Sequence, residues 1–256
     1  MAEPILYSLG PFEIPSIGNR HVRVYVPESS VAPSPRPVLY MFDGQNIFDD
    51  EPSYAGGWHL HRTALRLAKQ KRRTPVIVGI DHGGARRMDE LGPFTTERGG
   101  GLTDALLDWM ASSLLPRIRG DFGVASEPEH VGVGGSSMGG LAALYAHFKR
   151  PELFGLVLAM SPSLWFARGR IFEFIAGASK PWRSRIYLDA GGLEAGGRML
   201  KAAERLAAHL RDRGWDEHAL RFLAARRGTH NEKHWRRRAP LAIDFLFHRR
   251  SATIAG

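Results

Sequence analysis

The sequence predicts an α/β fold in which a mostly parallel sheet is covered by helices on both faces. Short apolar or alternating runs recur along the 256 residues, and longer segments with helical periodicity separate them. Strands that alternate with helices in this way are joined by right-handed crossovers, which place neighbouring strands parallel. Hydrophobic residues make up 43% of the chain and charged residues 24%, a composition that excludes disorder for most of it. No repeat or linker-like stretch divides the sequence, so we expect one domain over residues 1–256.

In the first half of the chain, the strands are predicted from their period or from their unbroken apolar character. Residues 21–26 alternate with a period of two, as a half-exposed strand does, and Pro27 ends the run. Residues 38–42 are apolar throughout, which is typical of a strand buried on both faces. The elements expected next are a helix over about 59–70, a strand over 75–80, a helix over about 103–118 and a strand over 130–133.

The second half continues the same alternation. It predicts helices over 138–148, 171–175, 198–211 and about 233–247, and strands over 154–160, 185–188 and 220–224. The least regular segments are 43–58 and 81–101, and each directly follows a predicted strand. Ligands of an open α/β sheet bind outside the carboxyl ends of its strands, so we expect these two loops to form walls of a site.

The composition excludes several classes of protein. The chain has no cysteine, which excludes disulfides, thiolate zinc sites and a cysteine nucleophile. The pair His59 and His61 is too sparse for a zinc site. No run approaches the roughly 18 to 20 apolar residues that span a bilayer, and Glu3 and Pro4 stand where a signal peptide would be cationic. We therefore expect a cytoplasmic protein that does not bind a membrane.

The formal net charge of +9 raises the question of an anionic partner, because clusters of Lys and Arg attract phosphates. The basic residues stand in short groups, and acidic residues interrupt most of the segments between them. Solvated helix faces explain this pattern best, so we expect no nucleic-acid binding; an anionic substrate or partner is the alternative. The groups are 71–73, 86–87, 226–227, 236–238 and 249–250.

The segment at 135–139 reads GSSMG and carries a G-x-S-x-G motif with Ser137 at its centre. A predicted apolar strand precedes it and a predicted helix follows it, which is the setting of a nucleophile elbow. Such an elbow holds its serine in a strained turn and brings strand and helix so close that glycine is needed at 135 and 139. It would direct the Met138 amide at a developing oxyanion. A Gly-rich phosphate loop is the alternative, but no lysine follows the glycines.

A serine hydroxyl needs a base, and enzymes with this elbow place their residues in the order serine, acid, histidine along the chain. His230 falls in a turn directly after the last predicted strand, where the base must hang over the elbow. His234 lies one helical turn further on and is expected to pack or to face solvent. The other late histidines lie in or at the ends of predicted elements, so the expected base is His230.

Two acidic residues follow the predicted strand at 185–188. Asp189 stands at the end of the strand, and Glu194 lies beyond the turn that comes next. The acid must reach an imidazole in a neighbouring loop, orient it and stabilise its cationic form. The longer excursion favours Glu194, whereas Asp189 would more simply bond to the backbone of the next turn. Spacing alone leaves Asp189 open as an alternative.

The loops after the strands at 38–42 and 75–80 supply the expected oxyanion and substrate contacts. The first loop begins at Asp43, where Gly44 permits close approach of a substrate and the amide of Gln45 is the expected second oxyanion donor. The second loop offers Arg86 or Arg87 to an anionic substrate, with a surface position as the alternative. Asp43, Gly44 and Arg87 are therefore candidate substrate contacts.

Six sequence blocks surround these residues. They are DGQNIFD at 43–49, GIDHGGARRMDELGPF at 79–94, GSSMGGL at 135–141, SPSLWF at 161–166, IYLDAGGLE at 186–194 and GTHNEKHW at 228–235. With them the sequence resembles the putative-esterase family of α/β-hydrolases, which includes esterase D-type, enterobactin, feruloyl and acetylxylan esterases. The resemblance covers most of the chain and implies an α/β-hydrolase fold without a large separate lid. It further implies Ser137 as nucleophile, His230 as base, Glu194 as the acid that closes the D-x-G-x-x-E block, and Trp165 in the pocket, with a core position as the alternative for Trp165.

The sequence thus predicts a carboxylic ester hydrolase that works through an acyl-enzyme. Ser137 would attack the acyl carbon, His230 would take and return the proton, and Glu194 would hold the ring, while the amides of Met138 and Gln45 bind the oxyanion. The mechanism needs no metal and no cofactor, and the partner is a small-molecule ester. An acyltransferase or thioesterase could use the same residues, and a catalytically silent binding module with a basic surface is the alternative from another class.

Overall fold

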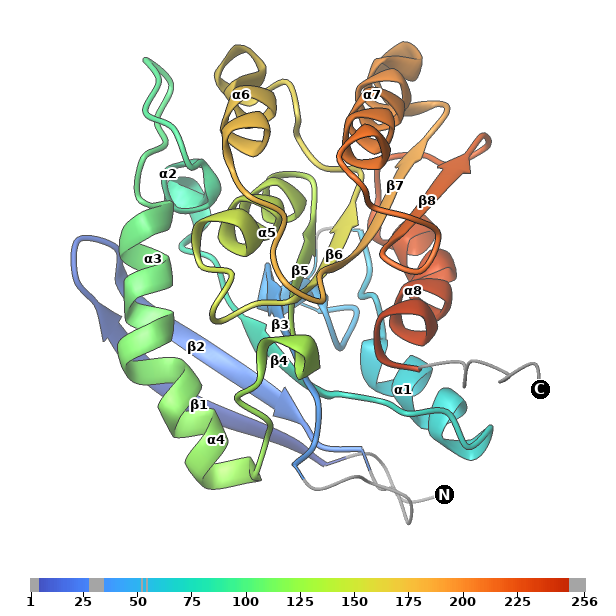
Figure 1. Ribbon diagram of the computed structural model, residues 1–256. Coiled ribbons are helices and arrows are strands. Elements are labelled where there is room, and N and C mark those ends of the chain that lie inside the picture. The colour runs from blue at the N-terminus through green and yellow to red at the C-terminus, as the bar shows by residue number, and fades with distance from the viewer. Residues whose placement is uncertain (1–4, 28–34, 52, 54, 249–256) are drawn as a thin grey trace.

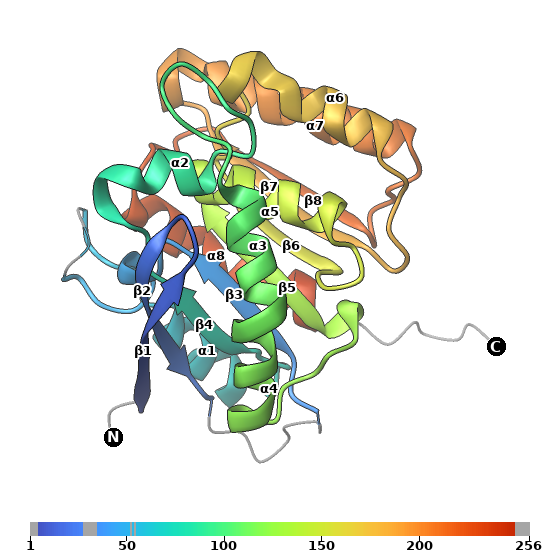
Figure 2. The ribbon, with the colours of Figure 1, turned by 90° about the vertical axis from the view of Figure 1, so that its left-hand side faces the viewer.

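The computed structural model describes residues 5–27, 35–51, 53 and 55–248. These residues form an eight-stranded sheet with helices on both faces (Figure 1, Figure 2). The strands are β1 (Leu6–Ile14), β2 (Gly18–Tyr25), β3 (Val38–Phe42), β4 (Val76–Ile80), β5 (Val131–Ser136), β6 (Leu156–Met160), β7 (Arg185–Gly191) and β8 (Leu220–Ala225). The helices are α1 (Leu60–Lys69), α2 (Arg87–Leu91), α3 (Thr103–Trp109), α4 (Leu115–Phe122), α5 (Met138–Lys149), α6 (Arg170–Gly177), α7 (Arg198–Asp212) and α8 (Glu232–Phe247).

The sheet is mostly parallel, as predicted. Its strand order is β1-β2-β4-β3-β5-β6-β7-β8, and every neighbouring pair from β4 to β8 is parallel. Only the β1–β2 and β2–β4 pairs are antiparallel among the described strands. The six strands β3 to β8 therefore end at the same edge of the sheet, and their following loops lie at that edge.

Two layers of helices cover the sheet. The larger core lies between the sheet and helices α3 to α7, and the smaller core lies between the opposite face and helices α1 and α8. Helices α1 and α8 lie side by side on that second face (Figure 1). No helix in the described ranges is long and apolar enough to cross a membrane.

The sequence did not predict strand β1 or helix α2, and it predicted a single helix where the structure has the two helices α3 and α4. Strand β1 lies at the edge of the sheet with mostly exposed or half-buried side chains, so it lacks the apolar period that marks a strand. Helix α2 has five residues, too few to establish a helical period within the loop at 81–101. The predicted helix over 103–118 is divided into α3 and α4 by a wider turn at Met110–Leu114, just before Pro116, whose nitrogen cannot donate to the helix.

Helix α5 follows the predicted elbow and is buried along almost its whole length. A helix that is apolar all round belongs in the core of a protein. Near its end, the Nδ1–H of His147 donates to the carbonyl of Phe154 at 2.7 Å, and its Nε2 accepts from the Ser184 hydroxyl at 2.7 Å. Trp215 donates to the same hydroxyl at 3.0 Å. These bonds fix α5, and with it the position of the elbow, against β6 and β7.

The burial of His147 predicts a loss of stability in mild acid. Burial lowers the pKa of His147 from 6.5 to about 4, so between these values the unfolded chain binds the proton and the folded chain does not. The free energy of unfolding should therefore fall by up to about 3 kcal/mol as the pH drops from 6.5 to 4. Denaturant unfolding at several pH values would measure this, with His147→Gln as the control that loses this part of the slope. An equal slope in both proteins would assign the acid sensitivity to other groups.

Candidate active site

Ser137 occupies a strained turn between β5 and α5. Its φ of 54° and ψ of −120° are unusual for a residue with a side chain. A Cβ at Gly135 would lie 2.7 Å from the carbonyl carbon of Gly139, and a Cβ at Gly139 would lie 2.9 Å from the Asp43 carboxylate. Only glycine fits at these two positions, which is the close approach of strand and helix that the motif predicts.

The hydroxyl of Ser137 is held by the loop that follows β6. Its Oγ lies 3.2 Å from the Oγ of Ser163, and the Ser163 amide donates to the Ser137 carbonyl at 2.9 Å. Among the described residues, the hydrogen-bond partner of this hydroxyl is Ser163 and not His230. Bonds between nucleophile and base often tighten only when substrate binds. Sequence reasoning did not single out Ser163, although it lies in the SPSLWF block.

Glu194 and His230 form a pair beside the elbow. The Oε2 of Glu194 lies 3.1 Å from the Nδ1 of His230, and the Glu194 side chain is completely buried. The other carboxylate oxygen accepts from the Ser161 hydroxyl at 2.8 Å and from the Gly191 amide at 3.0 Å. Because Oε1 is fixed by two donors, Oε2 is left facing the imidazole.

Two glycines allow the loops after β7 and β8 to approach each other. A Cβ at Gly191 would lie 2.4 Å from both the Glu194 carboxylate and the Gly228 carbonyl oxygen. The α-carbon of Gly191 would in turn lie 2.9 Å from a Cβ at Gly228. Larger residues would separate the loops, and with them the carboxylate of Glu194 and the ring of His230.

The other candidate acid, Asp189, is bound to helix α8 instead. Arg238 donates to its two oxygens, from Nε at 2.7 Å and from Nη2 at 3.0 Å, and the Tyr187 hydroxyl donates at 3.2 Å. Both members of the ion pair are buried. Asp189 also accepts from the Ser161 amide at 3.3 Å, which resembles the turn bond expected for it. Its carboxylate makes no hydrogen bond with His230 among the described contacts, so it ties the end of β7 to α8.

The cap of helix α8 explains why His230 and His234 differ. The side chain of Asn231 accepts from the His234 amide at 3.1 Å, so the helix begins at Glu232 and His230 remains in the preceding turn. The ring of His234 accepts from the Thr229 amide at 3.3 Å. His234 therefore supports the turn, whereas His230 pairs with Glu194 through Nδ1 and makes no hydrogen bond through Nε2 among the described contacts.

The amides of Met138 and Gln45 both lie at helix starts. Met138 is the first residue of α5, and Gln45 lies in a single 3₁₀ turn, Gly44–Asn46. The N–H groups at such positions have no acceptor within their own helix, so they can bind an anion. The side chain of Gln45 accepts from the His82 amide at 3.2 Å and so joins the two loops that were expected to wall the site.

Gly44 is packed closely against strand β4. A Cβ there would lie 2.5 Å from the carbonyl carbon of Gly79 and 2.6 Å from the nitrogen of Ile80. Glycine is thus required at position 44 because the loop after β3 packs directly on β4.

Asp43 and Arg87 pair with each other rather than standing as separate contacts. Arg87 donates from Nε at 2.5 Å and from Nη2 at 2.8 Å to the two oxygens of Asp43. Glu232 lies in the same charged group and accepts from the Asn46 side chain at 3.4 Å. Burial raises the pKa of the Glu232 carboxyl, and the nearby charge of Asp43 adds to this. The group connects the loop after β3, helix α2 and the start of α8.

Trp165 lines a cavity together with residues that neighbour Ser163 and Glu194 in the sequence. The side chain is 59% exposed, so it does not have the core position weighed as its alternative. The cavity has a volume of about 680 Å³ and lies between α6 and α7. Its lining includes Pro162, which stands between Ser161 and Ser163 in the sequence, and Ala195, which follows Glu194. Its remaining lining includes the apolar Leu164, Phe172 and Met199 and the basic Arg168, Arg198 and Arg205.

The described residues provide no metal centre of the usual kind. No group of three or more His, Asp or Glu side chains within the described ranges is placed to hold a metal ion.

Both the sequence and the fold are similar to those of known proteins. The sequence is 25% identical over 251 residues to the uncharacterized protein YbbA of Bacillus subtilis, covering 93% of this chain and 96% of that one. It is 29% identical to the iron(III) salmochelin esterase of Escherichia coli over 85% of this chain, and the match spans 52% of that enzyme's length. The fold is similar to that of the BES protein from Bacillus cereus, with a TM-score of 0.79, 18% identity and 97% of each chain covered. A family model described as putative esterase matches residues 17–242. The chain therefore belongs to the putative esterase family of ester hydrolases.

Proposed function

We propose that the protein hydrolyses carboxylic esters through an acyl-enzyme on Ser137, with His230 as the base and Glu194 as the acid. The observation that carries the proposal is the buried carboxylate of Glu194, which has one oxygen fixed by two donors and the other 3.1 Å from His230 Nδ1. A carboxylate only accepts, so Nδ1 carries the proton and Nε2 is left to act as the base. This is the tautomer that a serine hydrolase needs.

The reaction follows from these positions. Ser137 Oγ attacks the acyl carbon while its proton passes to Nε2 of His230, and Glu194 stabilises the resulting imidazolium. The amides of Met138 and Gln45 bind the oxyanion of the tetrahedral intermediate. When the intermediate collapses, the leaving alkoxide takes the proton from His230. Water then repeats the sequence on the acyl-enzyme, releases the carboxylic acid and restores Ser137.

The Asp43–Arg87 pair has a positioning role in this proposal. Its two hydrogen bonds join Asp43, at the start of the loop after β3, to α2. The Asp43 carboxylate also packs against Gly139 at the first turn of α5. The pair would hold the Gln45 amide at a fixed distance from the Met138 amide. Preorganised donors of this kind stabilise an oxyanion without having to reorganise during the reaction.

The cavity beside Trp165 is the proposed binding site for the body of the ester. Its apolar walls suit an aromatic or aliphatic group, and its three arginines suit an acidic substituent. The salmochelin esterase that this chain resembles suggests siderophore esters as one class to test.

Trp165→Ala should weaken the use of esters with a large aromatic acyl group. Loss of the indole removes a large apolar contact area, and we expect kcat/KM for such esters to fall roughly tenfold. An acetyl ester, which is too small to reach the cavity wall, should change little. The matched control is Trp182→Ala, because Trp182 is 82% exposed and does not line this cavity. An equal effect of Trp165→Ala on both esters would place the acyl group elsewhere.

A fluorophosphonate probe tests the proposal directly, because it labels only an activated serine. The wild-type protein and Ser136→Ala should be labelled, and Ser137→Ala should not. Labelling of Ser137→Ala to the wild-type extent, or no labelling of the wild type, would overturn the assignment. Mass spectrometry of the labelled peptide identifies the residue.

A further inference from the structure

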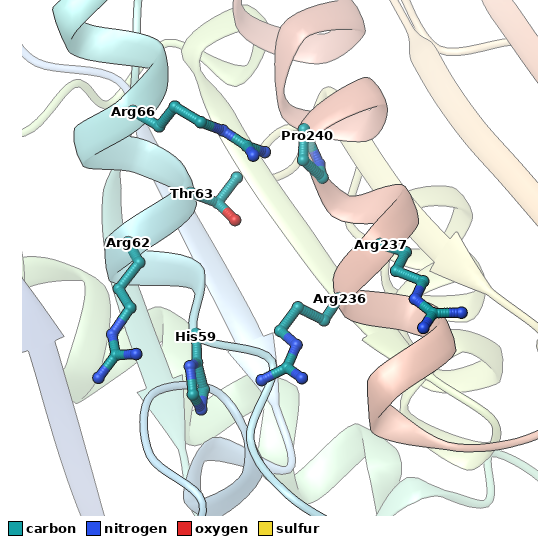
Figure 3. Close-up of a pocket in the computed structure, with 7 residues that line it drawn as sticks. All are labelled: His59, Arg62, Thr63, Arg66, Arg236, Arg237 and Pro240. Atoms are coloured by element: carbon teal, nitrogen blue, oxygen red, sulfur yellow. The ribbon is translucent and has the colours of Figure 1, made fainter.

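The three consecutive arginines at the start of α8 have different environments. Arg238 points inward to the buried Asp189, whereas Arg236 and Arg237 line a groove between α1 and α8. Arg62 and Arg66 line the same groove from α1 (Figure 3). Figure 3 shows Arg66 and Arg236 extending from opposite helices into the space between them, with His59, Thr63 and Pro240 completing the wall.

The positive charge of this groove is not balanced within the described part of the chain. None of its four arginines has a hydrogen bond or ion pair there, in contrast to the buried pairs Arg20–Glu90 and Arg238–Asp189. Asp50 lies close enough to Arg236 for their charges to interact, but its 67% exposed carboxylate already accepts from the Gly57 amide at 2.9 Å and from His59 at 2.8 Å. One exposed carboxylate does not neutralise four guanidinium groups.

The arrangement brings like charges close together, where they repel each other. Arg62 and Arg66 stand one helical turn apart on the same face of α1, where like charges destabilise a helix. Arg236 extends from α8 toward α1 across the same groove (Figure 3). An anion between the helices would remove this repulsion and would accept charge-assisted hydrogen bonds from both walls.

We propose that the groove between α1 and α8 is a binding site for a small molecule with two linked phosphate groups. The cavity has a volume of about 540 Å³, within the range of small-ligand sites. Guanidinium groups match phosphate oxygens in pairs, and arginines on two walls suit two phosphates better than one. These four arginines line one groove between two helices rather than a stripe along the surface, which favours a small ligand over nucleic acid. None of the lining residues belongs to the proposed catalytic site, so the inference is independent of the proposed function.

Pyrophosphate is the probe for this site. Isothermal titration at constant ionic strength should give saturable binding to the wild type, with orthophosphate binding more weakly. The double variant Arg62→Gln/Arg236→Gln should bind pyrophosphate at least about tenfold more weakly, because it loses one guanidinium from each wall. Thermal unfolding without ligand should be unchanged or shifted upward, since repulsion is reduced. Should this variant fail to fold, the exposed pair Arg66→Gln/Arg237→Gln serves the same purpose.

The charge-matched control is Arg119→Gln/Arg211→Gln, which removes two exposed arginines outside the groove. It should bind pyrophosphate within about twofold of the wild type, and ester hydrolysis should be unchanged in every variant. The proposal would be overturned by absence of pyrophosphate binding to the wild type, or by equal weakening in both double variants, which would indicate only net charge. A short DNA duplex whose binding to the wild type is weakened by Arg62→Gln/Arg236→Gln but not by the control, while pyrophosphate shows no saturable binding, would overturn it in favour of nucleic acid.

Discussion

Ser137→Ala should lower ester turnover by about 10⁶ while the protein remains folded, because nucleophile, base and acid act as one unit in a serine hydrolase. The substitution removes one hydrogen bond from the folded state, the 3.2 Å contact between the hydroxyls of Ser137 and Ser163, so the loss of stability should be small. Alanine meets the same backbone strain as serine at a φ of 54°, so the elbow itself should keep its geometry. Turnover of an activated ester, measured with protein whose thermal unfolding matches the wild type, gives the result.

Two neighbouring serines provide the controls. Ser136 ends β5 beside Ser137, and Ser136→Ala should retain most activity. Ser163→Ala removes the hydroxyl that contacts Ser137, so a modest change in kcat with little change in KM is expected. Comparable turnover by purified Ser137→Ala and wild type would exclude the serine mechanism.

The buried strands of the fold could be predicted because their sequences leave little choice. Strands β3 and β4 consist of apolar residues buried on both faces, and each is followed by a loop rich in glycine and charged residues. Strand β1 could not be predicted in this way, because an edge strand needs no apolar period. The hydrophobic pattern of a sequence reflects which residues are buried, so it predicts a strand least well where burial is incomplete.

The residues of the candidate site also differ in how well the sequence predicts them. Ser137 and His230 could be chosen from local signals, namely the glycines of the elbow and the turn before a helix cap. The contacts that support them are long-range, and no spacing in the sequence reveals them. The Asp43–Arg87 pair spans 44 residues, and the bond from Ser161 to Glu194 spans 33. Such pairs are specified by the order of strands in the sheet rather than by any local motif.

The choice between the two acidic residues shows this limit most clearly. Asp189 and Glu194 follow the same strand, and the position of Arg238, 49 residues after Asp189, separates their environments. Arg238 takes both oxygens of Asp189, whereas Glu194 has one oxygen directed at His230. An arginine four positions after His234 carries no recognisable signal of that role in the sequence.

Glu194→Gln should lose roughly 10⁴ in turnover, because the amide would hold His230 in the wrong tautomer. The Oε1 position accepts from Ser161 and Gly191, so the glutamine oxygen would occupy it and its NH₂ would face Nδ1 of His230. The imidazole could then only accept at Nδ1, which moves its proton to Nε2 and removes the base. Thermal unfolding should change little, since the two bonds at Oε1 survive.

Asp189→Asn is the matched comparison and should have the opposite signature. Asparagine leaves the buried guanidinium of Arg238 without its anionic partner, which should lower the free energy of unfolding by about 3–5 kcal/mol. Its effect on turnover should be small at a temperature where the variant is folded, because Asp189 makes no described contact with His230. Circular dichroism, denaturant unfolding and kinetics on both purified variants separate the two roles. If Asp189→Asn proved stable and inactive while Glu194→Gln remained active, the acid that orients His230 would be Asp189, and the 3.1 Å pair of Glu194 with the ring would have no part in catalysis.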